Sequence, residues 1–453
     1  MIDTAPRRAA APVTPHLTTS RGTALYIGAL LGPGLLLLPG LAVTVAGPAS
    51  VLAWIGLLIL SALFATVFAA FGLRFRSAGG VIGYVTAGLG PRAGRVTGWC
   101  FLAGVVAGAP VVCLIGASYV TELTGGGRLA RAGIGALLLL ALLALARGGL
   151  RSSAAAQLLL VALLIVVVTV AVAGTAGSVR AANWTPFAPH GWLAVAHAAA
   201  ILMLSFVGWE AVAPLTTAFR DPARQLTRVV AIAVAVTSAL YLGLAVVTVG
   251  VLGSRAATIV PLAGLLQRAI GPAGTPAAAV AAVVLTLGSV NAYISGGAAM
   301  AAHLAHRARP ADSARPESGG VPGATRPGPA FLVAVAGSGL LLISLYGVGV
   351  VSPASLVTIP TTLFLAVYLG CMVSAVRVLR GPARVAAVPA TAAVAVMLAC
   401  CGWGLALPAL VAVAVAVLGQ PGQRPQLLAR HHQVADAQQR QHRRMARASQ
   451  LQQ

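Results

Sequence analysis

Apolar runs of about twenty residues recur along most of the chain between residues 23 and 418, with short polar interruptions. A helix of that length crosses the hydrocarbon core of a bilayer, which is about 30 Å thick. Only 8% of the residues are charged, whereas a typical soluble domain carries about 25%. Such a composition cannot cover a surface that faces water. The sequence therefore predicts an all-α integral membrane protein.

Arg, Pro and Gly residues divide the apolar runs into about twelve predicted transmembrane helices. These are residues 23–45, 49–73, 96–121, 129–146, 153–174, 193–219, 229–252, 274–302, 329–350, 353–376, 385–400 and 402–418. The last two lie in one apolar stretch around "VMLACCGWGLALP". That stretch fits a tight turn between two helices, and it also fits one long tilted helix.

The arginine residues indicate how these helices are oriented. All 30 basic residues are Arg, and the net charge is +23. If the N-terminus is cytoplasmic and the helices alternate, 25 arginines fall in cytoplasmic segments and 5 fall outside. This is the bias of the positive-inside rule, so both termini are expected in the cytoplasm. The basic charge then faces anionic lipid, and we predict membrane lipids and no nucleic acid as its partners.

The segment "GALLGPGLLLLPG", Gly28 to Gly40, interrupts the first predicted helix. A proline inside a helix removes one backbone hydrogen bond and costs about 3 kcal/mol, so Pro33 leaves the Ala29 carbonyl without its usual partner. In a membrane, such a break persists only where it is buried in protein or lines a cavity. The break is either a kink that serves helix packing or an unwound binding site.

A second interruption, "SFVGWEAVAP", occurs five helices later and contains Gly208, Glu210 and Pro214. Two Gly/Pro-interrupted helices at corresponding positions of two halves indicate a transporter built from inverted repeats, with its site near the middle of the bilayer. We therefore predict a 5+5 inverted-repeat transporter core in which helices 1 and 6 are broken.

This organisation predicts three parts of the chain. Residues 1–22 form a cytoplasmic N-terminal segment, residues 23–418 the transmembrane domain, and residues 419–453 a disordered basic cytoplasmic tail. Within the domain, we expect inverted repeats at about 23–174 and 193–376, followed by two extra helices at 385–418. The Arg-, Pro- and Gly-rich residues 303–328 are expected to be a disordered connection.

Glu210 is the one acidic residue, of seven in the chain, that lies well inside a predicted transmembrane helix. A charged side chain at the bilayer centre costs about 2.5–3.5 kcal/mol on insertion scales, so it usually faces a cavity and serves an ion or a substrate. The alternative is a protonated carboxyl group that is hydrogen-bonded to neighbouring backbone. A carboxyl group in either arrangement can carry a proton.

The sequence lacks the residue clusters that other functions need. The eight histidines form no pair with a second membrane acid, and no two acids are close enough to suggest a metal or nucleophile motif. The five cysteines lie in apolar segments, which argues against a disulfide framework or a zinc site. We predict no enzyme activity, no metal and no cofactor. A channel is disfavoured because no repeated pore loop is present.

Three motifs resemble the amino acid–polyamine–organocation (APC) superfamily of permeases. "GALLGPGLLLLPG" is similar to the glycine-rich signature of their first helix, and "SFVGWEAVAPLTTAFRDPARQLTRVV" to their sixth helix and the loop after it. "RSAGGVIGYVTAGLGPRAGRVTGW" is similar to the segment between their second and third helices. The resemblance covers about residues 22–418. In its short loops and in "GPASVLAW" the chain is similar to actinobacterial permeases near the methionine and branched-chain amino acid exporters, which implies a multi-pass protein of a bacterial cell membrane.

The resemblance implies substrate-binding residues at both breaks. In the first helix, Gly32, Gly34 and Leu35 would present backbone N–H groups to a substrate carboxylate. In the sixth, the substrate-binding residues Phe206, Val207 and Gly208 would present carbonyl groups to the ammonium. Trp209 or Phe206 would form an aromatic lid over the site.

Two further assignments concern coupling and the pocket wall. Glu210 would serve proton coupling or gating. Asn291 and Ser295, in "GSVNAYISGG", are weaker pocket candidates, and interhelical hydrogen bonding explains such small polar residues equally well.

This chain also departs from the family pattern. Many relatives have Ser or Thr where this chain has Pro33, so a hydroxyl group and an N–H group are missing from the carboxylate site. No lysine is present, which leaves Glu210 as the candidate for proton coupling.

We therefore predict a secondary active transporter of neutral, apolar amino acids, with the amino acid and a proton as its small-molecule partners. The alternatives are a cationic amino acid or polyamine transporter or exchanger, and a sensor on the same fold that does not transport. The substrate, the direction of transport and the oligomeric state cannot be read from the sequence.

Overall fold

The computed structural model describes residues 18–32, 34–75, 80–148, 154–212, 219, 221–308 and 327–418. The regular secondary structure within these residues is helical. The helices of the first half are α1 (Thr19–Leu30), α2 (Gly34–Ala46), α3 (Ser50–Arg74), α4 (Gly80–Leu89), α5 (Pro91–Thr124), α6 (Arg128–Arg147) and α7 (Ala154–Thr175). The later ones are α8 (Leu193–Leu202), α9 (Trp209–Val212), α10 (Pro222–Leu252), α11 (Pro261–Ile270), α12 (Gly274–Ala308), α13 (Pro329–Gly347), α14 (Pro353–Val378), α15 (Pro382–Cys400) and α16 (Ala406–Leu418).

The prediction of an all-α membrane protein is confirmed. Within the described residues, nine helical segments are long and apolar enough to cross a membrane, and three more apolar helices are shorter. In the part of the chain that the structure describes, each of the twelve predicted transmembrane segments overlaps one or more helices. The first and sixth are each divided into two helices, as the Gly and Pro residues predicted.

Two helices were not predicted. α4 and α11 each have 10 residues, which is too short to span a bilayer. α11 begins at Pro261, in the first-turn position that proline favours. Both were missed because the sequence was searched for apolar runs of membrane-spanning length.

The C-terminal apolar run consists of two helices. α15 ends at Cys400, a short 3₁₀ turn follows at Gly402–Leu405, and α16 begins at Ala406. Gly402 has a φ angle of +54°, a backbone conformation in which glycine is favoured because it has no Cβ atom. The tight turn is therefore the correct alternative for this run.

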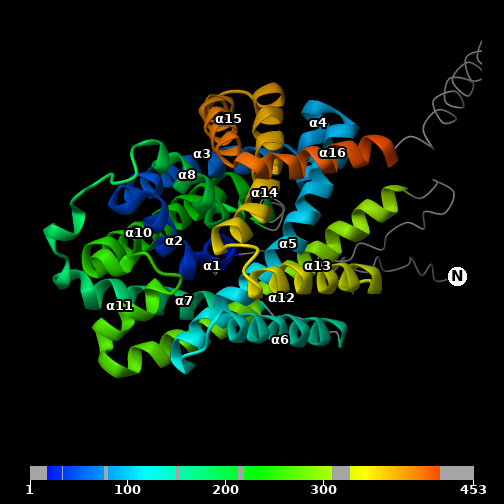
Figure 1. Cartoon of the computed structure of the whole chain (residues 1–453). Coiled ribbons are helices and arrows are strands. Elements are labelled where there is room, and N and C mark those ends of the chain that lie inside the picture. The colour runs from blue at the N-terminus through cyan, green and yellow to red at the C-terminus, as the bar shows by residue number, and fades with distance from the viewer. Residues whose placement is uncertain are drawn as a thin grey trace, which may run out of the picture.

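The two broken helices lie at the centre of the bundle and pair crosswise. α1 packs against α9, and α2 packs against α8, so each half of one broken helix contacts one half of the other. Figure 1 shows α1 and α2 between α10 on one side and α5 on the other. This is the arrangement expected of two inverted repeats, and it brings all four helix ends at the breaks together.

Helix α5 packs mainly against α12 and α14, and it also contacts the second half of the first broken helix. Small residues let it approach its neighbours closely, for example Gly116, where an added Cβ atom would lie 2.6 Å from Thr286 Oγ1 of α12. The Tyr119 hydroxyl of α5 donates a hydrogen bond of 2.6 Å to the Leu36 carbonyl of α2. The second half of the first broken helix is thus fixed to α5.

Several sequence predictions lie outside the described residues. They concern most of the N-terminal segment 1–22, most of the connection 303–328, and the tail 419–453. Pro33 and Pro214, which are part of the two interruption motifs, also lie outside.

Candidate functional site

The first break separates α1 from α2 at Leu31 and Gly32. The Leu31 amide donates to the Ile27 carbonyl at 2.8 Å, and the Gly32 amide donates to the Leu30 carbonyl at 3.0 Å. The helix has therefore ended before it restarts at Gly34. Because the first N–H groups of a helix have no partner within it, α2 presents its positive end at this point.

Gly32 and Gly34 face different surroundings. An added Cβ atom on Gly32 would find no heavy atom of the described residues within 4 Å, so among these residues there is open space beside it. An added Cβ atom on Gly34 would lie 3.0 Å from Leu38 Cδ1 and 3.1 Å from Ser205 Oγ. Leu35 is fully buried, and its amide donates to the Gly32 carbonyl at 3.2 Å. The open space at Gly32 is where a small ligand could reach the start of α2.

The second break lies between a short 3₁₀ turn, Met203–Phe206, and α9. Val207 is extended, with φ −72° and ψ 128°, and Gly208 has a φ angle of +148°. The backbone of Gly208 passes so close to the Ala29 carbonyl that an added Cβ atom would collide with it. Ala29 carries the carbonyl that Pro33 deprives of its helical partner, so the two breaks contact each other at this carbonyl.

One tyrosine joins both breaks. The Tyr241 hydroxyl, from α10, lies 2.7 Å from the Leu30 carbonyl and 2.8 Å from the Ser205 carbonyl, so its single proton is shared between them. Its ring packs 5.2 Å from Phe206 and 5.3 Å from Trp54 of α3, measured between ring centroids. These contacts keep the two carbonyls and the phenol together in a buried aromatic cluster.

Glu210 is buried, with 7% of its surface exposed. Its Oε2 atom accepts hydrogen bonds from the Gly208 amide at 3.0 Å and from the Tyr368 hydroxyl of α14 at 2.5 Å. The Tyr368 ring packs between Phe64 and Phe68 of α3. No basic side chain in the described part of the chain forms an ion pair with Glu210. The carboxyl group is thus bonded to the backbone of its own break and to one phenol.

The aromatic residues of the second break are anchored to α3. Trp209 is 1% exposed, and its Nε1 atom donates to Ser61 Oγ at 2.9 Å. Tyr26 of α1 meets the indole edge-on, with ring centroids 6.4 Å apart. Phe206 is also buried and packs against Trp54. Val207 is half-buried, so it is the more accessible member of this segment.

The two candidates on α12 are located differently. Asn291 is half-buried, while Ser295 is exposed and donates through its hydroxyl to the Asn291 carbonyl at 2.9 Å. At 100° per residue, Tyr293 lies on the opposite face of α12. This tyrosine packs towards Gly108 of α5, where an added Cβ atom would be 3.5 Å from its ring.

Sequence reasoning missed the tyrosines that organise the breaks, Tyr241 and Tyr368. A signal was available, because a tyrosine inside an apolar helix needs a hydrogen-bond partner for its hydroxyl. The chain has only seven tyrosines, and these two lie in predicted transmembrane helices. Their partners were not readable, since Tyr241 and Leu30 are 211 positions apart.

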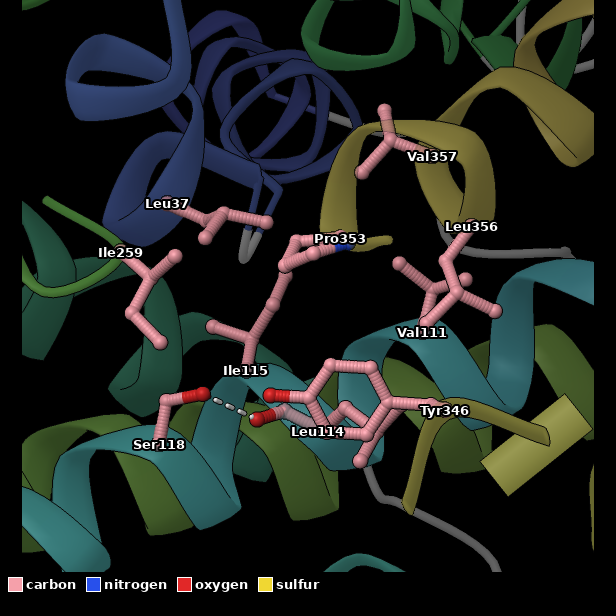
Figure 2. Close-up of a pocket in the computed structure, with 10 residues that line it drawn as sticks. All are labelled: Leu37, Val111, Leu114, Ile115, Ser118, Ile259, Tyr346, Pro353, Leu356 and Val357. Carbon is pink, nitrogen blue, oxygen red and sulfur yellow. Dashed lines mark hydrogen bonds between the residues drawn. The ribbon is translucent and has the colours of Figure 1, made fainter. Parts of the chain in front are cut away.

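A separate, partly open cavity lies between α2, α5, α13 and α14. It is lined by Leu37, Val111, Leu114, Ile115, Ser118, Ile259, Tyr346, Pro353, Leu356 and Val357 (Figure 2). Both hydroxyl groups in this lining are engaged, since Ser118 donates to the Leu114 carbonyl at 2.7 Å and Tyr346 accepts from Arg131 at 2.7 Å. The cavity offers an apolar wall about one turn along α2 from Gly34, and its lining contains no charged side chain.

The described residues also include no cluster of three or more His, Cys, Asp or Glu side chains that could hold a metal ion. All five cysteines are free thiols, and four of them are buried. The chemistry of the breaks therefore rests on backbone groups, hydroxyl groups and the Glu210 carboxyl group.

The chain is an all-α membrane protein whose two interrupted helices pair crosswise at the centre of the bundle, an arrangement typical of inverted-repeat transporters. Residues 17–308 match the family model described as amino acid permease. The chain belongs to this family, and the resemblance to the APC superfamily is confirmed. It is accordingly a multi-pass membrane protein.

Individual relatives agree with this assignment. The chain is 31% identical to the uncharacterized amino acid permease YecA of Bacillus subtilis, over 88% of this chain and 94% of that protein. It is 30% identical to the L-methionine/branched-chain amino acid exporter YjeH of Escherichia coli, over 86% of this chain and 92% of that protein. It is also 26% identical to the branched-chain amino acid permease BcaP of Bacillus subtilis, over 51% of this chain and 53% of that protein.

Proposed function

We propose that this permease is a secondary active transporter of neutral, apolar amino acids that works by alternating access and is coupled to protons. The observation that carries the proposal is the meeting of the two broken helices beside the open space at Gly32. Two of the relatives are named for branched-chain amino acids, and one of these also for methionine. The apolar composition around the breaks suits side chains of that kind.

The ends of the broken helices supply the groups that a zwitterion needs. The start of α2 has a positive dipole end, which suits the carboxylate of the substrate, and the Gly34 amide has no partner among the described residues. The amides of Gly32 and Leu35 already donate to the Leu30 and Gly32 carbonyls and would contribute by position. The second break offers carbonyl groups to the ammonium, from Phe206 to Gly208. In this proposal Trp209 forms part of the aromatic wall of the substrate site. Asn291 and Ser295 are weaker candidates for lining the same site.

The preference for a neutral substrate rests on the charges at the site. Glu210 is the one buried ionisable acid among the described residues, and its Oε2 atom already accepts two hydrogen bonds. A cationic substrate would need this carboxyl group as its counterion, although the Gly208 amide and the Tyr368 hydroxyl already share its Oε2 atom. Cationic substrates are therefore the second candidate.

Glu210 is the proposed site of proton coupling. Changing Glu210→Gln keeps the size of the side chain and removes the exchangeable charge, so net transport should lose its dependence on pH while exchange of one amino acid for another continues. Transport is measured in proteoliposomes at two pH values. The matched control is Glu122→Gln, since Glu122 is an exposed acid at the end of α5. Proton coupling that is unchanged in Glu210→Gln would remove this residue from the mechanism.

The proposal includes an orientation. We propose that both termini are cytoplasmic, since that places 25 of the 30 arginines on the cytoplasmic side. The repeats would span about residues 23–174 and 193–376, with helices 385–418 outside them. Reporter fusions at the C-terminus that are active only in the periplasm test this, and an active fusion would reverse the orientation.

Counterflow is the experiment that tests the substrate class. Proteoliposomes are loaded with unlabelled amino acids, and each labelled amino acid is added outside in turn. Accumulation of leucine or methionine, without arginine or glutamate, is the expected result. Accumulation of arginine alone would favour the cationic alternative. No accumulation from correctly folded protein would contradict transport of amino acids and favour a sensor.

A further inference from the structure

Ser205 carries a buried hydroxyl group that the fold does not use. The residue is 3% exposed, and its Oγ atom has no hydrogen-bond partner within the described part of the chain. Its backbone carbonyl, in contrast, is held by the Tyr241 hydroxyl at 2.8 Å. A hydroxyl group that is buried without a partner costs free energy, so an unpaired one at a fixed position requires an explanation.

The position of this hydroxyl group is informative. Ser205 Oγ lies 3.1 Å from the point that a Cβ atom on Gly34 would occupy, so it sits directly beside the first residue of α2. α2 has 13 residues, and its N-terminal end carries a partial positive charge. The hydroxyl group belongs to the second broken helix, so it is a separate polar feature beside the N-terminal end of α2.

Donors are scarce at this end of α2. Pro33 has no N–H group, and the Leu35 amide already donates to the Gly32 carbonyl at 3.2 Å. The Gly34 amide is left as the donor without a partner in the described structure. A carboxylate has two oxygen atoms and binds best where several donors converge.

We propose that the Ser205 hydroxyl and the Gly34 amide together bind the carboxylate of the transported amino acid. The assignment rests on the proposed function, and it adds a side chain from the second broken helix to a site otherwise made of backbone. The unpaired hydroxyl group then has its partner in the ligand. Substrate binding would link the two broken helices, because the two oxygen atoms of the carboxylate would contact a group from each helix.

The test compares Ser205→Ala with Thr248→Val in the full-length protein. Thr248 of α10 also has a buried hydroxyl group without a hydrogen-bond partner among the described residues, so its replacement is a matched control at another place. The ligands are L-leucine and L-leucinamide, which keeps the ammonium and the side chain but has no negative charge. A hydrogen bond to a charged group is worth enough that Ser205→Ala should weaken leucine binding by about 10- to 100-fold.

Four measured results support the proposal together. Leucine binding falls in Ser205→Ala and stays unchanged in Thr248→Val. The loss for leucinamide is at least about threefold smaller, since a hydrogen bond to a neutral group is weaker. The melting temperature without ligand is unchanged or higher, because an unpaired buried hydroxyl group has been removed. Ser205→Cys, which keeps the size but has a weak donor, shows the same selective loss.

Equal losses for leucine and leucinamide, or unchanged leucine binding, would overturn the proposal. A lower melting temperature in both Ser205→Ala and Ser205→Cys would also overturn it, since the hydroxyl group would then stabilise the fold. Failure of the proposed function is seen separately. If the wild-type protein binds no amino acid, the function is wrong before any variant is compared.

Discussion

The contact between Gly208 and Ala29 allows a quantitative prediction for Gly208→Ala. The φ angle of +148° is one that residues with a Cβ atom rarely adopt, and such strain costs about 1–3 kcal/mol. The added Cβ atom would also collide with the Ala29 carbonyl. This obstacle is backbone, so it cannot rotate away, and forced overpacking costs about 1–3 kcal/mol more.

Together these penalties amount to about 2–6 kcal/mol, a large part of the stability of a typical domain. We expect Gly208→Ala to lower the melting temperature and to abolish counterflow, because the two breaks can no longer touch. The measurements are thermal unfolding in detergent and counterflow in proteoliposomes.

Gly337→Ala is the matched control. Gly337 lies in the middle of α13, where an added Cβ atom meets no described heavy atom within 4 Å. Alanine is favoured over glycine in a helix by up to about 1 kcal/mol, so this variant should be as stable as the wild type or more stable. If Gly208→Ala melts and transports like Gly337→Ala, the contact between the breaks has no energetic importance.

Two other substitutions separate ligand binding from stability. In Gly32→Ala the new Cβ atom enters open space, so the melting temperature should not change. Substrate binding should weaken by at least about tenfold, because the ligand needs that space. Unchanged binding by titration would show that the substrate lies elsewhere. Tyr241→Phe leaves two buried carbonyls without their shared donor, which should reduce stability by about 1–3 kcal/mol. Thermal unfolding that matches the wild type would show that water replaces the phenol.

The features that the sequence predicted well are local ones. Gly32, Pro33, Gly34 and Gly208 are poor helix formers within apolar runs, and both breaks occur where these residues predict them. The membrane itself makes such signals reliable, because an interruption must be accommodated by protein. The site assignments at these residues remain predictions.

The features that the sequence could not supply depend on packing between distant segments. That Trp209 donates to Ser61, 148 positions away, follows from how α3 lies against the second break. The hydroxyl of Tyr368 reaches Glu210 from 158 positions away. No periodicity in either segment predicts such a pairing. The short helices α4 and α11 were not predicted for another reason, since their length is similar to that of many connections between transmembrane helices.

The crosswise pairing of the broken helices has a mechanical consequence. α1 packs against α9 and α2 packs against α8, and within the first pair the backbone of Gly208, which precedes α9, lies against the Ala29 carbonyl of α1. If α1 and α9 tilt relative to each other, a contact between two backbones with no side chain between them would act as a pivot that allows tilting and resists sliding. In such a tilting movement, the displacement of a residue grows with its distance from the pivot. Groups beside the contact would therefore keep their geometry while the far ends of the same helices swing through the largest arcs.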